Sequence, residues 1–267
     1  MFTLINRICF IITLLLSLTI SQDYLWPIKA KKEITAVFGK ERPGRYHTAV
    51  DIRTFGEIRY HLVAIDDGYI SRIRTSSKGY GKTIYLTLHD GNTAVYAHLD
   101  HFTPEVDNLV NALHEDYGKY TIDHKIDPDD YPVKKGDLLG YSGDTGGVSG
   151  PHLHFEIRDG YGQPVNPFQY SLDLPDNLPP EAESIAVIPL DENAIIDGFS
   201  EQKIFPLQKI NDNEYVLADP IFAFGNIGIA IKTIDKISGQ HFNFGIYSIN
   251  LLLDAQFIYS MQYNKID

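Results

Sequence analysis

The sequence is poor in cysteine, with only Cys9 among its 267 residues. Ten histidines accompany this single cysteine, so a metal site would have to use imidazole and carboxylate ligands. Net positive charge is also lacking, because 35 acidic residues outnumber 23 basic ones and give a formal charge of -12. A chain this acidic is poorly suited to bind nucleic acid or an anionic membrane surface, so neither is an expected partner.

An apolar run long enough for a transmembrane helix is missing as well. The run Cys9–Ile20 is about a dozen residues long, whereas a helix needs about 20 to span a bilayer. Arg7 precedes the run, and Thr19 and Ser21 place small residues next to a cleavage position, which is typical of a signal peptide. We therefore predict a signal peptide at residues 1–21, no stable membrane span after its removal, and a secreted or periplasmic protein without disulfides.

The residues after the predicted signal peptide have the alternation and turn signals of an all-β fold. Four segments rich in Ile, Val, Tyr and Thr predict strands at residues 61–65, 68–74, 82–89 and 92–99. The dipeptide Asp90-Gly91 is a strong signal for a two-residue hairpin between the last two. In the strand after it, alternation predicts one face with Asn92, Ala94, Tyr96 and His98, and another with Val95, Ala97 and Leu99.

Residues 102–132 interrupt this pattern as a helical insert. Thr103 suits the N-cap and Pro104 the first helical position. Apolar residues then follow at i, i+3, i+4 and i+7, namely Val106, Leu109, Val110 and Leu113, which indicates an amphipathic helix that ends before Gly118. Residues 123–130 are expected to form an acidic loop, and strand structure should return in residues 132–142.

A second domain is predicted after a proline-rich linker at residues 173–183. Strand patterns resume beyond it at residues 184–190, 214–218, 227–234, 246–253 and 256–263, with Asp254-Ala255 as a tight turn. We expect residues 22–172 to form the first domain and residues 184–267 to form an Ig-like β-sandwich. Because an apparent strand stops close to Asp267, this sandwich is expected to be incomplete.

The most informative stretch is residues 142–158, SGDTGGVSGPHLHFEIR, where a glycine-rich loop precedes an alternating segment. In a strand, His152, His154 and Glu156 would face one side, and the apolar residues between them would be buried on the other. Two imidazoles on one face of such a strand indicate half of a site. Two interpretations of Glu156 stay open: an acceptor that orients one histidine, or a solvent-exposed carboxylate.

Candidate partners for these histidines lie in residues 45–53, RYHTAVDIR, and at His98. A flat strand would hold the Cα atoms of His47 and Asp51 roughly 13 Å apart. Ligands of one zinc ion lie about 2.0 to 2.2 Å from it, so this pair can chelate only if the chain bends between them. His98 ends a predicted strand, and His101 is a weaker alternative to it.

These residues resemble the lysostaphin-type, or LytM-like, zinc metallopeptidases. That family carries His-x-Gly-x-Asp, a later Ala/Gly-His-Leu and a Ser-Gly-Pro-His-Leu-His-Phe-Glu segment in this order. Here the same motifs read HTAVD (47–51), YAHL (96–99) and SGPHLHFE (149–156), and the resemblance covers roughly residues 27–170. It implies an antiparallel β catalytic domain, the duplicated hybrid motif. Ala49 replaces the family's glycine and would be strained if that position required a positive φ.

Carried over residue by residue, the resemblance implies that zinc is bound by His47, Asp51 and His154. It also implies that His98 and His152 are catalytic histidines that do not bind the metal. Three protein ligands with an open position are typical of catalytic zinc. One histidine would act as general base and the other would stabilise the tetrahedral oxyanion, and His152 is favoured as the base. The remaining histidines are expected outside the site: His61, His89, His114, His124 and His241.

The resemblance implies an exported zinc metalloendopeptidase of the cell envelope that hydrolyses peptide cross-links in bacterial peptidoglycan. We expect D-Ala to diaminopimelate bonds to be favoured over glycine bridges, with peptidoglycan peptide stems as partners and a protein regulator left open. A first alternative is a non-catalytic LytM-like module that binds peptidoglycan or activates an amidase. A second is a phosphocarrier with a related β fold and paired histidines, and the predicted signal peptide and Asp51 count against it.

Overall fold

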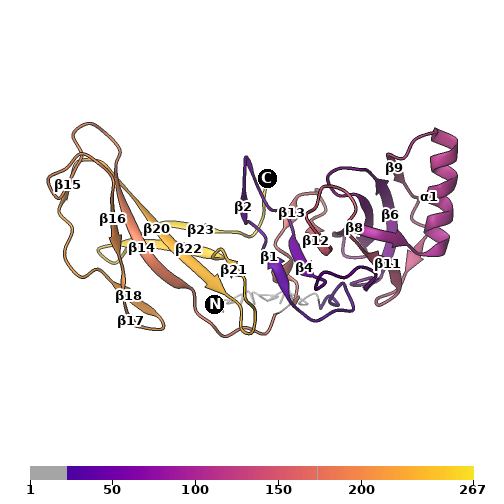
Figure 1. Ribbon diagram of the computed structural model, residues 1–267, viewed down its shortest axis with the longest axis horizontal. Helices are drawn as coiled ribbons and strands as arrows, with labels where there is room; N and C mark the ends of the chain where they lie inside the picture. Colours follow the sequence, from indigo (N-terminus) through magenta and orange to yellow (C-terminus); the bar gives the residue numbers. More distant parts are fainter. Residues whose placement is uncertain (1–22, 173) are drawn as a thin grey trace, which may run out of the picture.

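The computed structural model describes residues 23–172 and 174–267 (Figure 1). The predicted signal peptide, residues 1–21, lies outside the described residues. Strands dominate the described chain, and it contains one α-helix, which confirms the all-β prediction with a helical insert. Within the described ranges, no helix has the length and apolar character needed to cross a membrane.

An 11-stranded antiparallel sheet forms the first half of the described chain. Its main path, in spatial order, is β1 (Ile34–Ala36), β4 (Val50–Arg53), β12 (His152–Arg158), β8 (Thr93–Phe102), β7 (Lys82–Leu88), β6 (Gly68–Thr75) and β10 (Pro132–Val133). The strands that pair beside this path are β5 (His61–Val63), β9 (Ile122–Lys125), β11 (Leu138–Ser142) and β13 (Pro164–Val165). A separate hairpin joins β2 (Glu41–Arg42) to β3 (Arg45–Tyr46). The predicted strands between residues 61 and 99 are all present, with shifted ends.

The register of the sheet brings the three sequence motifs together. Strand β12 lies between β4 and β8, and His154 is opposite Asp51 on one side and Ala97 on the other. Residues directly opposite each other in an antiparallel pair point to the same face. The register therefore places Asp51, Ala97 and His154 on one face of the sheet, and it brings together the HTAVD, YAHL and HLHFE motifs, which begin at residues 47, 96 and 152.

The prediction that His98 and Tyr96 share one face of their strand is wrong. Tyr96 points into the core, where its hydroxyl donates a hydrogen bond to the carbonyl oxygen of Val63 at 2.9 Å. His98 instead points toward the face that carries His154, and their ring centroids are 5.5 Å apart. The reason is local backbone geometry, because His98 has a φ of 65° and reverses the alternation of β8. Strict two-residue periodicity cannot anticipate such a residue.

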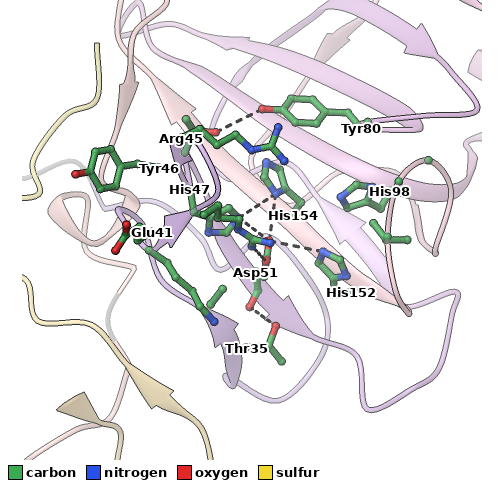
Figure 2. Close-up of a pocket in the computed structure, with 18 of the residues that line it drawn as sticks. Thr35, Glu41, Arg45, Tyr46, His47, Asp51, Tyr80, His98, His152 and His154 are labelled. Carbon is green, nitrogen blue, oxygen red and sulfur yellow. Dashed lines mark hydrogen bonds and ion pairs between the residues drawn. The ribbon is translucent and has the colours of Figure 1, made fainter. Parts of the chain in front are cut away.

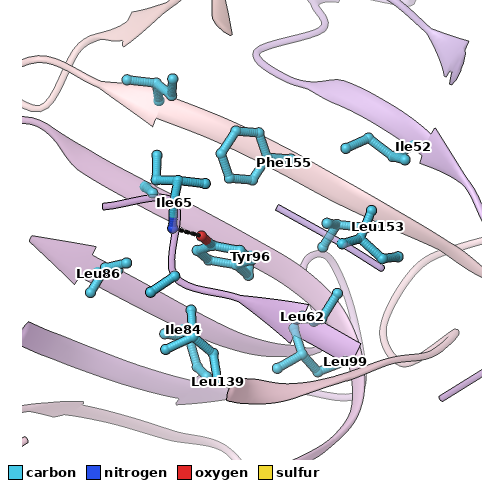
Figure 3. Close-up of a cluster of buried hydrophobic side chains, with 14 of the residues drawn as sticks. Ile52, Leu62, Ile65, Ile84, Leu86, Tyr96, Leu99, Leu139, Leu153 and Phe155 are labelled. Atoms are coloured by element: carbon cyan, nitrogen blue, oxygen red, sulfur yellow. Dashed lines mark hydrogen bonds between the residues drawn. The ribbon is translucent and has the colours of Figure 1, made fainter. Parts of the chain in front are cut away.

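The other face of the sheet forms the hydrophobic core (Figure 3). The apolar residues of β12, namely Leu153, Phe155 and Ile157, are completely buried, as the alternation predicts. Phe155 packs edge-to-face on Tyr96, with ring centroids 5.2 Å apart. This buried face fixes β12 in the sheet, so the histidines on its opposite face have a rigid support.

Helix α1 (Pro104–Tyr117) confirms the predicted insert, with Gly118 in the left-handed conformation after its last turn. Thr103 is the N-cap residue, but its side chain makes no capping hydrogen bond. Two details of the prediction are wrong. Strand β9 occupies the start of the predicted acidic loop because it pairs with β6, and the predicted strand at residues 132–142 is divided by a turn into β10 and β11.

The chain after the predicted linker is also made of strands. They are β14 (Glu181–Pro189), β15 (Ile195–Ile196), β16 (Lys203–Pro206), β17 (Gln208–Asn211), β18 (Glu214–Val216), β19 (Ala223–Phe224), β20 (Ile227–Lys236), β21 (Asn243–Phe244), β22 (Ser248–Leu253) and β23 (Gln256–Gln262). Four of them form a sheet in the order β16-β14-β20-β21. Strand β14 begins inside the predicted linker, and the turn between β22 and β23 has positive φ at both Asp254 and Ala255, as a tight hairpin requires. The domain boundaries and the Ig-like assignment stay predictions.

The last residues of the chain return to the first half of the molecule. Lys265 forms a β-bridge with Val165, and the backbone N–H of Asn166 donates to the carbonyl oxygen of Asn264 at 2.8 Å. In Figure 1 the C-terminus accordingly lies near β2 and β13, whereas most of β14 to β20 extends to the opposite end from α1. The short 3-10 helix η1 (Pro167–Gln169) follows this contact.

Candidate metal and catalytic site

A cavity of about 1350 Å³ opens over the sheet face opposite the core. All five residues that the sequence indicates for the site line it: His47, Asp51, His98, His152 and His154. Figure 2 shows them converging from β4, β8, β12 and the segment after β3. The hairpin of β2 and β3, the glycine-rich loop at residues 146–149, Tyr80 and the last residues of the chain, Ile266 and Asp267, also line it.

Three of these residues form a compact set of metal-binding atoms. Nε2 of His47 and Nδ1 of His154 both lie 3.1 Å from Oδ1 of Asp51, and 3.3 Å from each other. Tetrahedral ligands about 2.0 to 2.1 Å from a zinc ion are roughly 3.3 Å apart, so these atoms fit the edges of a zinc site. All three side chains are buried, and the described chain offers no other such group of three. The donor set of two imidazoles and one carboxylate suits zinc.

The predicted bend between His47 and Asp51 is present. Strand β3 ends at Tyr46 and β4 begins at Val50, so His47 lies in the connection. Its backbone N–H donates to the carbonyl oxygen of Lys40 at 2.9 Å, which anchors the bend. Ala49 is fully buried and is not among the described residues with positive φ. Alanine at the family's glycine position therefore introduces no left-handed strain.

Backbone carbonyls orient three of the four imidazoles. The Nδ1 atoms of His47, His98 and His152 each lie within hydrogen-bond distance of a carbonyl oxygen. The acceptors are, in the same order, Val37 (3.0 Å), Thr145 (2.9 Å) and Gly150 (2.9 Å). A carbonyl oxygen can only accept, so Nδ1 carries the proton in the neutral ring and Nε2 keeps its lone pair. Each of these rings therefore has Nε2 free to bind a metal or accept a proton.

His154 has the reverse orientation. Its Nδ1 belongs to the metal-binding set, and its Nε2 donates to Oε1 of Glu156 at 2.9 Å. Glu156 is completely buried and also accepts hydrogen bonds from Thr48 at 2.8 Å, from Arg158 at 2.7 Å and from the hydroxyl of Tyr80. Of the two interpretations left open for Glu156, the orienting acceptor is confirmed and solvent exposure is wrong.

The charges in the site follow from burial and from these hydrogen bonds. Burial opposes ionisation of Asp51, but hydrogen bonds from His154 and His47 hold the pKa of its carboxyl well below the usual value. Glu156 behaves in the same way: burial raises its pKa, but the bonds to His154 and Arg158 outweigh this and lower it to about 2. Burial, together with the neighbouring His152, lowers the pKa of His98 to about 4, so this ring is neutral at neutral pH.

His98 and His152 lie beside the metal-binding set without belonging to it. Their ring centroids are 4.9 Å apart, and Nε2 of His152 is 3.6 Å from Oδ1 of Asp51. Both rings, when neutral, present a lone pair to the cavity, which is the arrangement of a proton acceptor. To stabilise an oxyanion through Nε2, a ring would need a second proton on that atom. The geometry of His98 and His152 therefore favours proton transfer over oxyanion stabilisation.

The histidines expected outside the site do not line the cavity. His101, the weaker alternative to His98, is also absent from it: its Nδ1 lies 3.0 Å from Asp100, and its ring stacks on Tyr141. Sequence reasoning did not single out Tyr80 or Arg42. Tyr80 lies between two glycines that read only as a turn, and Arg42 lies in a hairpin without apolar periodicity.

The chain is also similar in sequence to known peptidases. A family model described as "Peptidase family M23" matches residues 117–167, a segment that includes His152 and His154. A curated relative, "DD-carboxypeptidase/endopeptidase Mpg" of Neisseria meningitidis serogroup B, is 31% identical over 132 residues. The same protein of Neisseria gonorrhoeae has the same identity. These matches cover 49% of this chain, and the chain spans about a quarter (24%) of the length of the relatives.

Two solved peptidase structures match 58% and 53% of the chain. A zinc-containing peptidase from Vibrio cholerae is 24% identical, covers 58% of this chain and 41% of its own, and has a TM-score of 0.41. The catalytic domain of lysostaphin from Staphylococcus simulans is 25% identical, covers 53% of this chain and 90% of its own, and has a TM-score of 0.37.

Proposed function

We propose that this chain belongs to the LytM type of peptidase family M23 and is an exported zinc metalloendopeptidase that cuts peptide cross-links in bacterial peptidoglycan. One observation carries the proposal: His98 and His152 present free Nε2 atoms to the same cavity as a buried His-Asp-His set. Such a set beside two unliganded proton acceptors meets the requirements of metal-assisted peptide hydrolysis. Export follows from the predicted signal peptide at residues 1–21.

In this proposal, His47, Asp51 and His154 hold the zinc ion through the three atoms that lie 3.1 to 3.3 Å apart. The chemistry that zinc supplies when bound is polarisation of the scissile carbonyl and acidification of the attacking water. Glu156 keeps the ring of His154 in the orientation that presents Nδ1 to the ion. Asp51 stays ionised because its pKa is held well below the usual value.

His98 and His152 transfer protons in the proposed reaction. A neutral imidazole accepts a proton from the attacking water at Nε2 and later returns it to the amine nitrogen that leaves. We assign the first role to His152, because its Nε2 lies 3.6 Å from the metal-binding oxygen of Asp51. His98 lies next to it, with ring centroids 4.9 Å apart, and its Nε2 is the second proton acceptor in the cavity.

The proposed substrate bond is the one between D-Ala and diaminopimelate. The name of the Neisseria relatives, DD-carboxypeptidase/endopeptidase, supports a bond next to a D-amino acid over one within a glycine bridge. Peptidoglycan peptide stems are therefore the proposed partners. Residues 184–267 are proposed as a separate Ig-like domain after the linker at residues 173–183, and a protein regulator remains compatible with the site.

Digestion of purified cross-linked muropeptides tests this function. Zinc-loaded protein is expected to convert dimers to monomers, and mass spectrometry of the products identifies the bond from the newly formed termini. Products that end in D-Ala and expose a diaminopimelate amine support the proposed bond. Dimers that stay intact while the protein binds them would instead favour the non-catalytic module.

A further inference from the structure

Basic residues outnumber acidic ones where the hairpin of β2 and β3 lines the cavity, because Glu41 is its one carboxylate there, and Asp267 lines the cavity from the end of the chain. Lys40, Arg42 and Arg45 all line the cavity and fall within six residues of sequence, in a chain whose formal charge is -12. Within the described ranges, neither Lys40 nor Arg45 makes an ion pair. In Figure 2, Arg45 and Tyr46 lie on the hairpin side of the site, whereas His98 and His152 lie on the other.

Arg42 lies in direct contact with the metal-binding set. Its Nη2 atom is 3.1 Å from Oδ2 of Asp51, while Oδ1 of the same carboxylate faces His47 and His154. The two oxygens of Asp51 are thus divided between the arginine and the metal position. Any group that Arg42 binds in the cavity must consequently lie next to the position of the reacting bond.

Arg42 has donors that the described residues do not use. Asp51 is its one hydrogen-bond partner there, and its Nε atom is buried without a partner. A guanidinium offers five N–H donors in a planar fork, and a buried donor without an acceptor is unfavourable. A carboxylate accepts two parallel hydrogen bonds from this fork, so it is the anion that best satisfies the free donors.

The proposed substrate has a carboxylate at the required place. In a D-Ala to diaminopimelate cross-link, the carbon attached to the scissile nitrogen also bears a free carboxylate. Within a glycine bridge, the same carbon bears a peptide carbonyl and no charge. A carboxylate so close to the scissile nitrogen would enter the cavity beside the metal position, which is where the guanidinium of Arg42 lies.

We propose that Arg42, assisted by the charges of Arg45 and Lys40, binds the substrate carboxylate adjacent to the scissile bond and selects carboxylate-bearing peptides over neutral ones. This inference rests on the proposed peptidase function and adds the determinant of its specificity. In this proposal Arg42 binds Asp51 through Nη2 and the substrate through N–H groups that Asp51 does not use. The exposed side chains of Arg45 and Lys40 contribute attraction over a longer distance.

The test compares two cross-linked peptides that differ only at this carboxylate, one free and one converted to the carboxamide. Zinc-loaded full-length protein is assayed for kcat/KM on both, as wild type and as Arg42→Gln, Arg42→Lys and Arg45→Gln variants. Lys119→Gln is the matched control, because it removes one exposed charge just after α1 and outside the cavity. Metal content and thermal unfolding of each variant are measured in parallel.

We expect wild type and Lys119→Gln to prefer the free carboxylate by roughly 10- to 100-fold, as loss of a charge-assisted hydrogen bond implies. Arg42→Gln should abolish this preference chiefly by slowing cleavage of the free carboxylate, and Arg45→Gln should reduce it. Equal kcat/KM of wild type on both peptides would overturn the proposal. An equal loss of kcat/KM on both peptides in Arg42→Gln would also overturn it, because an arginine that only orients Asp51 affects both peptides alike. Such results leave the peptidase function intact.

A second readout separates the inference from the proposed function. If neither peptide is cleaved, the peptidase proposal fails. Binding of the two peptides to the same protein samples, measured by calorimetry, then tests whether Arg42 binds the carboxylate. Tighter binding of the free carboxylate that is lost in Arg42→Gln supports the site. Equal affinity for both peptides overturns it.

Discussion

Nε2 of His154 lies 2.9 Å from Oε1 of the completely buried Glu156, so a carboxylate fixes the metal-facing orientation of this ring. Replacing the carboxylate in Glu156→Gln keeps the shape but removes the charge that makes His154 a stronger ligand. We predict a zinc affinity lower by about 10- to 100-fold, measured by competition with a chromophoric chelator. Glu115→Gln, at an exposed position of α1, is the matched control. An unchanged affinity in Glu156→Gln would show that the contact does not tune the metal site.

The histidines should separate into two classes on mutation. His154→Gln removes a metal-binding atom, so the purified protein should lose most of its zinc and its activity together. His152→Gln should keep stoichiometric zinc and lose about 10²- to 10⁴-fold in kcat, because it removes only a proton acceptor. Metal analysis and turnover are measured on the same samples. Loss of zinc from His152→Gln would place this residue among the ligands instead.

Gly146 holds two loops of the cavity wall in close contact. It has a φ of 89°, and a Cβ there would lie 2.4 Å from the carbonyl oxygen of Gly79, next to the cavity residue Tyr80. Gly146→Ala should therefore displace Tyr80 from Glu156 and reduce activity at least about tenfold, beyond the roughly 1 kcal/mol cost of alanine at positive φ. Gly162→Ala is the control, since its φ is 81° but no atom lies within 4 Å of its Cβ. Equal effects in the two variants would contradict this explanation.

Phe155 should be a major contributor to stability of the first half of the chain. It is completely buried and packs on Tyr96. On β12 it directly follows His154 and precedes Glu156. Phe155→Ala is expected to lower the free energy of unfolding by about 3 to 5 kcal/mol, as cavities left by large core residues do. Denaturant unfolding followed by far-UV circular dichroism measures it. Phe222→Ala, at a side chain that is 75% exposed, should change stability by less than about 0.5 kcal/mol.

Sequence patterns predicted much of the site because β12 obeys strict alternation. Its apolar residues are buried and its histidines face the cavity, as two-residue periodicity requires. The same rule was wrong for His98, because its positive φ reverses the alternation of side chains between the two faces of β8. The bend between His47 and Asp51 could be predicted only as a geometric necessity of chelation, since no glycine or proline marks it.

What the sequence could not provide were contacts between distant segments. Glu156 is buried because Tyr80 and Thr48 come to it from two other parts of the chain, and a single strand pattern does not reveal them. Arg42 is similar, because its contact with Asp51 depends on how the hairpin folds back over β4. In the second half of the chain, several strands are only two residues long, which is too short for periodicity to detect.

The most direct measurement of the central claim is muropeptide digestion by His98→Gln and wild-type protein, each loaded with one zinc ion per chain. His98 lies in the cavity beside His152 but outside the metal-binding set, so its loss separates catalysis from metal binding. We predict that wild type converts cross-linked dimers to monomers, while His98→Gln binds zinc equally well and leaves at least about 99% of the dimers uncut over the same time. Equal conversion by both proteins, or none by the wild type, would contradict the account.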